Sequence, residues 1–234
     1  MNDTQPDMKS AHGRMPAELL VWMSPAFPTG AFAYSQGLET AVTQGWVSNA
    51  ENLQSWMEMS CLHGALRNDL ILMSLVMRSD SDPQIQELAD LSAALQPSAE
   101  RAQETLDQGR SFWTAYREAW RPKQHRAMDD IIPDNSMTLP VAVALAASEH
   151  AIAADGALES YAIAFASNQI SAAIRLGVIG QVGGQRVIAD LMPNLRRLSE
   201  QAVSATEADL GSATYGVDLA CILHETQTTR LFRS

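Results

Sequence analysis

Apolar residues recur at helical spacing along most of the chain, and almost no segment alternates apolar and polar positions over the length of a β-strand. Residues 16–23 begin with a proline and are rich in apolar side chains, which predicts a short helix. Two prolines and a glycine within residues 24–30 exclude a regular helix there. A second helix is expected over residues 34–44, ending at Gly45.

Helix-start signals divide the middle of the chain. Ser48 and Glu51 have the spacing of a capping box, in which the hydroxyl and the carboxylate each satisfy a free backbone amide. A long helix is expected to follow and to run to about Met77. Prolines next to N-cap residues predict two further amphipathic helices. These begin at Asp82–Pro83, with apolar positions Ile85, Leu88, Leu91 and Leu95, and at Pro97–Ser98, with Phe112, Trp113, Tyr116 and Trp120.

Two stretches, residues 139–154 and 157–176, are rich in alanine and apolar around much of their circumference. Helices of this kind pack closely against neighbours at the centre of a protein. A glycine-rich turn at residues 180–185 opens another helix that runs toward Val203. The pattern therefore predicts an all-α fold, a single-domain bundle of about eight to ten helices.

The all-helical domain is expected to span residues 15–204. Residues 1–14 are polar and predict a flexible, disordered leader. Residues 121–136 mix basic, acidic and proline residues without a period, which predicts a mobile loop. Residues 205–234 are expected to form a polar linker followed by a C-terminal docking tail.

The tail, residues 224–234, combines charged and amide side chains with the apolar pair Leu231 and Phe232. Chain ends usually fray into polar segments, so this composition is typical of a segment that a partner surface orders. Burial of the apolar pair and hydrogen bonds from the tail's arginines could stabilise that state. We then expect the chain from about Ala220 onward to be poorly ordered in the free protein. A tail packed on the domain's own core is the alternative, and spacing alone does not decide between them.

Charge and composition exclude some classes of partner. Asp and Glu number 27 against 16 Lys and Arg, a formal net charge of -11, so the protein's field repels phosphate backbones and anionic membrane surfaces. We expect neither nucleic acid nor membrane as a partner. The polar first 14 residues lack the apolar core of a signal peptide, and no later run approaches the roughly 18 apolar residues of a membrane span. Two cysteines without a CxxC pair fit a reducing cytoplasm.

The neighbouring Cys and His residues offer one weak metal-binding pattern. Cys61 and His63 are two positions apart, so on a helix they point about 160° away from each other. Cys221 and His224 have the better i, i+3 spacing, although a buried cysteine beside a histidine on a helix face is the more ordinary arrangement. The alternative function that follows is a metallochaperone that binds nickel directly through these positions.

No catalytic motif is present in the sequence. The glycine-rich turn at residues 180–185 lacks the Lys-Ser/Thr ending of a phosphate-binding loop, and no strand is predicted before it. There is no Gly-x-Ser-x-Gly elbow and no His-Glu-x-x-His helix. Glu149 and His150 could act as an acid-base pair only beside a substrate, and a solvated helix edge is the simpler interpretation. We expect no enzymatic activity and no cofactor.

Several short motifs occur together in one order along the chain. They are residues 24–30 (SPAFPTG), 34–39 (YSQGLE) and 45–47 (GWV), His63–Gly64 with Arg67 and Asp69, residues 168–175 (NQISAAIR), Gly180–Gln181, Gly184–Gln185, residues 209–212 (DLGS) and the tail. As a set they cover essentially everything after the leader, and on them the chain resembles the urease accessory protein UreF family. Val178 stands where that family has a proline and Gly183 where it has an acidic residue, which bears on any partner contact at that turn.

The resemblance implies an all-helical, dimer-forming scaffold that is not an enzyme. It implies a position between an accessory protein called UreD or UreH and the GTPase UreG, during insertion of nickel into apo-urease. It further implies that the partners, and not the scaffold, hold nickel and GTP. The alanine-rich helices are the expected dimer contact.

The resemblance also implies site residues. Phe32 and Tyr34 with Arg230 are expected to shape the surface offered to the GTPase, and the tail from His224 is expected to contact the UreD-type partner. The full set expected to bind partners is Phe32, Tyr34, Ser35, Gln36, Glu39, Gln181, Gln185, His224, Glu225, Arg230, Leu231 and Phe232. Asn168, Gln169 and Arg175 lie on an apolar helix, where polar groups need paired partners, and are expected in a structural network or in the dimer contact.

Overall fold

Helix α7 (Leu139–Glu149) is enclosed by its neighbours, with an unbroken run of buried residues from Pro140 to Ala147. It packs against α6 (Ala99–Ala119) and α4 (Ala65–Arg78). Alanine and valine side chains make up most of this run, and they let the three helices approach closely. The alanine-rich stretch therefore forms the centre of the bundle, as its composition predicts.

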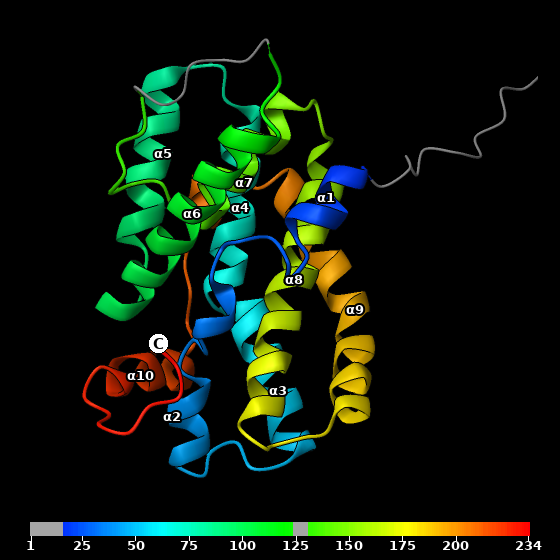
Figure 1. Cartoon of the computed structure of the whole chain (residues 1–234), viewed down its shortest axis with the longest axis vertical. Helices are drawn as coiled ribbons and strands as arrows, with labels where there is room; N and C mark the ends of the chain where they lie inside the picture. The colour runs from blue at the N-terminus through cyan, green and yellow to red at the C-terminus, as the bar shows by residue number, and fades with distance from the viewer. Residues whose placement is uncertain (1–15, 124–130) are drawn as a thin grey trace, which may run out of the picture.

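The computed structural model describes residues 16–123 and 131–234, and Figure 1 shows their arrangement. The remaining elements are α1 (Ala17–Trp22), the 3-10 turn η1 (Ala31–Ala33), α2 (Leu38–Thr43), α3 (Ala50–His63), α5 (Asp82–Ala94), α8 (Ala154–Arg175), α9 (Gln181–Val203), the 3-10 turn η2 (Glu207–Asp209) and α10 (Tyr215–His224). Over these described ranges the chain is a single helical bundle without strands, which confirms the predicted fold class. None of the described helices combines the length and the apolar character that crossing a membrane requires.

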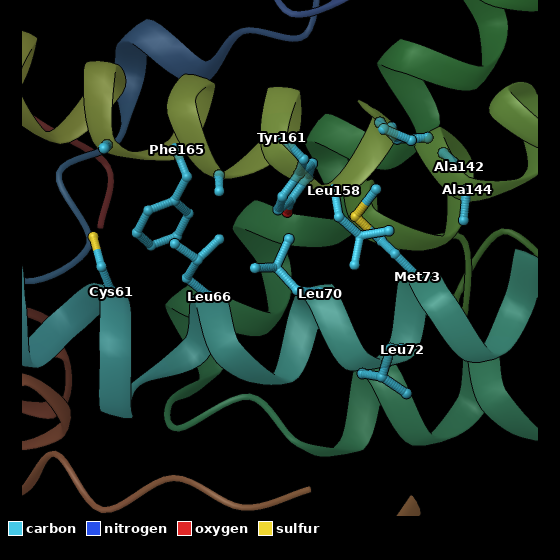
Figure 2. Close-up of a cluster of buried hydrophobic side chains, with 14 of the residues drawn as sticks. Cys61, Leu66, Leu70, Leu72, Met73, Ala142, Ala144, Leu158, Tyr161 and Phe165 are labelled. Atoms are coloured by element: carbon cyan, nitrogen blue, oxygen red, sulfur yellow. The ribbon is translucent and has the colours of Figure 1, made fainter. Parts of the chain in front are cut away.

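Helices α4 and α8 form the second layer of the core. Figure 2 shows Leu66 and Leu70 on α4 pointing toward Tyr161 and Phe165 on α8. All four side chains are buried. On its other side α8 packs along α9, so α8 joins the core to the outer part of the bundle.

The long helix expected from residue 48 to about Met77 is two helices, α3 and α4, so that prediction is wrong. Gly64 separates them with an extended backbone, φ −105° and ψ −152°. A Cβ at this position would lie 2.6 Å from the carbonyl oxygen of Ser60, closer than any side chain tolerates. The helix therefore ends at Gly64 although the apolar pattern continues past it. The spacing of apolar residues contains no information about such a close backbone contact.

The start of α3 is also capped differently from the prediction. Asn49, not Ser48, is the N-cap, and its side-chain oxygen accepts a hydrogen bond from the Asn52 amide at 3.0 Å. The capping box that Ser48 and Glu51 predict is not formed, because the helix begins one residue later than that box requires. At α6 the prediction is confirmed, since Ser98 caps the helix by accepting from the Arg101 amide.

Helix α2 is shorter than the expected range of 34–44. Gln36 and Gly37 both have positive φ, 55° and 80°, so the helix starts only at Leu38. Gly37 also lies against α10, where an added Cβ would be 2.9 Å from the Cys221 amide nitrogen. The left-handed turn thus brings α2 into close contact with α10.

Glu149 does not lie on a solvated helix edge, so that interpretation is wrong. Its carboxylate is buried and accepts hydrogen bonds from the Tyr116 hydroxyl at 2.7 Å and the Arg121 guanidinium at 2.9 Å. His150 is within 3.1 Å of the Trp120 carbonyl oxygen through Nε2. The pair therefore fastens the end of α7 to the end of α6.

Two expectations concern residues that lie wholly or partly outside the described ranges. The leader, residues 1–14, lies outside them, and so do residues 124–130 of the expected mobile loop. The linker expected over residues 205–216 contains η2 and ends at the first residues of α10.

Candidate functional site

Helix α10 has two faces of different character. Its inner face, with Ala220, Cys221 and His224, is buried against α2, α3 and α6. Its outer face carries an apolar stripe that we call the α10 stripe. This comprises Tyr215, Leu219, Ile222 and Leu223, with relative exposures of 87%, 46%, 50% and 37%. Contiguous exposed apolar surface on a helix is typical of a protein interaction site.

The tail after α10 turns back onto the domain (red in Figure 1). One carboxylate holds it, because Glu39 on α2 accepts from the backbone amides of Leu231 at 2.6 Å and Phe232 at 2.9 Å. Phe232 is buried, whereas Leu231 remains exposed. The structure thus shows the tail packed on its own domain. The expectation of poor order from about Ala220 onward is wrong, since these polar contacts offset the entropy of ordering.

His224 is fully buried between two carboxylates. Its Nδ1 is 2.6 Å from Glu100 on α6, and its Nε2 is 3.2 Å from Glu39. Each ring nitrogen therefore faces a carboxylate oxygen, and which nitrogen donates depends on the tautomer. Glu100 also pairs with the Arg230 guanidinium. The end of α10 and the tail are therefore tied to α2 and α6 by charge-assisted hydrogen bonds.

Glu225, Gln181 and Gln185 do not form one surface. The Glu225 carboxylate accepts from the Ala99 amide at 2.8 Å, which satisfies a free amide at the start of α6. Gln181 and Gln185 are exposed on the first turns of α9, and α9 packs on α8, α3 and α4. The structure therefore places Glu225, with the rest of the tail, against the start of α6. The two glutamines on α9 lie on a separate part of the molecule.

The turn around η1 lies beside the tail. The Ser35 amide donates to the Ser234 carbonyl oxygen at 2.8 Å, and the Arg233 amide donates to the Ala33 carbonyl oxygen at 2.8 Å. In this turn Phe32 is 69% exposed. The two segments that the sequence resemblance assigns to two partners are thus hydrogen-bonded to each other.

Tyr34 and Gln36 point inward from the same turn. The Tyr34 hydroxyl donates to Asp107 at 3.3 Å, and burial raises the pKa of this tyrosine. The Gln36 amide donates to Glu104 at 3.0 Å, and the Ser234 hydroxyl donates to the other oxygen of Glu104. Tyr34 and Gln36 therefore support the turn from below, leaving Phe32 as its exposed side chain.

Glu100 and Glu104 were missed by the sequence reasoning. Both lie on α6, four residues apart on one helix face, and both bind the tail. Glutamates at this spacing usually lie on a solvated face. Arg101, between them in sequence, is buried and ion-paired to Glu104. An arginine next to the two glutamates is the sequence feature that could have indicated a buried polar cluster here.

The three polar residues expected on α8 are not brought together in one network. Gln169 is fully buried, and neither polar atom of its side chain has a hydrogen-bond partner in the described part of the chain. Asn168 lines a cavity of about 610 Å³ between the α1–α2 connection, α6 and α8. Arg175 stacks on aromatic rings at the end of α8.

The polar end of that cavity contains Asp69, Arg101 and Glu104. Burial raises the pKa of Asp69 to about 7, even though the Tyr161 hydroxyl donates to it at 2.8 Å. The lining also includes apolar side chains of the α1–α2 connection, among them Phe27. The cavity thus reaches from the exposed turn to the carboxylates beneath the tail.

The Cys and His positions do not converge. Cys61 and Cys221 are buried, and burial raises the pKa of each thiol to about 12, which disfavours the thiolate that a metal requires. His63 is exposed, and the ring nitrogens of His224 both face carboxylates on opposite sides of the ring. Across residues 16–123 and 131–234 no group of three or more potential metal ligands is present.

An exposed apolar helix stripe, an aromatic turn and a tail held beside that turn define a helical protein with an interaction surface. Comparison with known proteins identifies the family to which this protein belongs. The family model UreF matches residues 47–192. The protein named urease accessory protein UreF from Methylobacterium radiotolerans is 43% identical over 219 residues, covering 92% of this chain and 95% of that protein.

Other relatives carry the same name. The one from Rhodopseudomonas palustris (strain TIE-1) is 41% identical over 220 residues, covering 92% of this chain and 91% of the relative. The one from Rhizobium etli is 41% identical over 217 residues, covering 92% and 95%. The chain belongs to the UreF family. This is a family of accessory proteins rather than enzymes.

Proposed function

We propose that this protein is a scaffold for urease maturation that bridges a UreD/UreH-type accessory protein and a UreG-type GTPase. In this role it couples GTP hydrolysis to insertion of nickel into apo-urease. Family membership supports the role in urease maturation, because the relatives are named for it. The proposal assigns nickel and GTP to the partners, gives this protein no cofactor of its own, and places it in the cytoplasm.

The α10 stripe is the observation that carries the proposal. The inner face of α10 is packed against α2, α3 and α6, and the outer apolar side chains stay exposed among the described residues. Burying one such side chain in an interface contributes roughly 1.5–3 kcal/mol. We assign the α10 stripe and the exposed Leu231 of the tail to the UreD-type partner.

Substitution within the α10 stripe tests this assignment. Ile222→Asp places a charge at a half-exposed position, so the domain should stay folded while the interface has to desolvate a carboxylate. Affinity for the UreD-type partner should fall by about 10-fold or more. Leu20→Asp on α1 is the matched control, since Leu20 is a similarly exposed apolar residue, 64% against 50%, on a helix that lies apart from α10 in Figure 1. Equal co-purification of wild type and Ile222→Asp would remove the assignment.

The aromatic turn is assigned to the GTPase. Phe32 is the exposed side chain of this turn. Arg230 in the tail, which the resemblance adds to this surface, is paired with Glu100. Phe32→Ala should weaken GTPase recruitment while leaving the UreD-type partner bound. If both partners are lost together, or neither is, the division into two surfaces is wrong.

A homodimer is also part of the proposal, with a narrower contact than the sequence predicts. Helix α7 is enclosed within the chain and cannot take part. On α8 the positions Ala164, Ser167 and Ser171 are not fully buried, and their small side chains would permit close helix approach. Ala164→Arg should therefore produce a monomer by light scattering, and a monomeric wild type in the UreD-type complex would exclude the dimer.

A further inference from the structure

Arg175, the last residue of α8, lies between two aromatic rings. Its guanidinium carbon is 3.9 Å from the centre of the Phe32 ring and 4.2 Å from the centre of the Phe232 ring. Both distances are within the range of a cation–π contact, which arginine makes with the flat face of its guanidinium. One ring belongs to the exposed turn and the other to the tail.

The guanidinium has little else to hold it. Its Nε is 3.4 Å from the Ser171 carbonyl oxygen, and its buried Nη2 has no hydrogen-bond partner within the described residues. Burial is the cause that lowers the pKa of this arginine, with no carboxylate contributing. Because no ion pair with another described residue fixes the side chain, its position depends on the two rings.

The two rings differ in exposure. Phe232 is 3% exposed and is fastened through its own amide to Glu39, whereas Phe32 is 69% exposed. The exposed Phe32 ring therefore packs on the Arg175 guanidinium. The guanidinium in turn packs on the Phe232 ring, which belongs to the tail. The backbone hydrogen bonds between Ala33, Ser35 and the tail align the segments, but they do not contact the Phe32 ring.

We propose that Arg175 is a positioning residue that makes the orientation of the exposed Phe32 ring depend on whether Phe232 is seated. This deepens the proposed function, since it states how the tail alters the surface assigned to the GTPase. Arg175 itself contacts no partner in this arrangement. Its effect passes through the two rings.

Fluorine NMR of the isolated protein tests the proposal without any partner. The chain has 5 phenylalanines, so 4-fluorophenylalanine gives few signals, and Phe32→Leu identifies the one from residue 32. Phe232→Leu keeps an apolar group in the tail but removes the ring, and it should shift the Phe32 signal in the wild type. In an Arg175→Met background, which keeps the side-chain length but removes the charged plane, most of that shift should be lost.

Controls separate positioning from a general structural effect. Arg186→Met, at an exposed position on α9, should leave the response of the Phe32 signal to Phe232→Leu unchanged. Arg175→Lys keeps the charge without the flat face, so it should also lose most of the response, and it serves if Arg175→Met lowers the melting temperature. A Phe32 signal that ignores Phe232→Leu in the wild type, or that responds in the Arg175 variants as strongly as in the wild type, overturns the proposal. Partner binding is a separate measurement, so failure of the proposed function would be recognised independently.

Discussion

Helix α7 and the C-terminal tail are both packed within the molecule, but they are held in different ways. α7 is held mainly by its unbroken run of buried apolar residues from Pro140 to Ala147. The tail is held by carboxylates, with Glu39 on α2 and Glu100 and Glu104 on α6 accepting from its amides, His224, Arg230 and Ser234. Apolar burial is not directional, whereas hydrogen bonds to a carboxylate need both partners in place.

This difference gives the two regions different stabilities. The α7 contacts form only with the whole bundle, so we expect α7 to open only with global unfolding. The tail can leave its carboxylates while the bundle remains intact, because among the described residues Phe232 is its one large apolar side chain that is buried. A segment with few buried apolar contacts opens at low free energy, which suits a tail that responds to partners.

Truncation of a core side chain should have the largest effect. Leu145→Ala, at a buried position of α7, should lower the free energy of unfolding by about 2–5 kcal/mol, because it removes buried methyl groups and leaves a cavity. Urea denaturation followed by far-UV circular dichroism measures this. A loss below about 1 kcal/mol would mean that the bundle relaxes around α7, and the contrast with the tail would then fail.

The pH dependence of stability should reveal the buried carboxyl group of Asp69, which lies on α4 in the polar lining of the cavity. Burial raises the pKa of Asp69 to about 7, above the unfolded value of about 3.9. A raised folded pKa means that the protonated form favours folding. This contribution is fully present below about pH 4 and is lost as the pH rises through about 7.

Asp69→Asn should remove the loss of stability that the wild type shows as the pH rises. The neutral amide does not ionise, and its oxygen can still accept from the Tyr161 hydroxyl. We expect the variant to gain stability relative to wild type as the pH rises from 4 to 8, by an amount on the order of a few kcal/mol. Urea midpoints across this range measure the difference. Parallel curves for the two proteins would show that Asp69 titrates as in the unfolded chain. Asp80→Asn, at an exposed position, is the control.

The core could be predicted from the sequence because its signals are local. The alanine-rich stretches, the Ser98 cap and the period of α9 each fall within a few turns of one helix, and the structure confirms them. The break at Gly64 could not be predicted, since it depends on how closely the backbone approaches Ser60. Local pattern thus predicts helices better than it predicts where they end.

Much less of the tail could be predicted. The apolar pair was visible, but Glu39 is 193 residues from Phe232 in sequence and Glu100 is 124 from His224, so no local pattern joins them. The same carboxylates are indistinguishable from solvated surface charges until the fold brings them together. This is why the sequence alone leaves the tail open between docking and packing on its own domain.

Weakening the carboxylate that holds the tail should have the smallest effect on global stability and the sharpest local one. Glu39→Gln keeps the size of the side chain but leaves one oxygen to serve two amides and His224, and it removes the negative charge. Hydrogen bonds to a charged group contribute roughly 1.5–3 kcal/mol, and here that loss falls on seating of the tail. The melting temperature should therefore change far less than in Leu145→Ala, while trypsin should cleave after Arg230 roughly 10-fold faster or more. Glu51→Gln, at an exposed position on α3, is the control, and trypsin should cleave it after Arg230 at the wild-type rate. If Glu39→Gln instead unfolds the bundle without faster cleavage of the tail, the tail is part of the global folding unit, and the difference between the two regions is one of chemistry only.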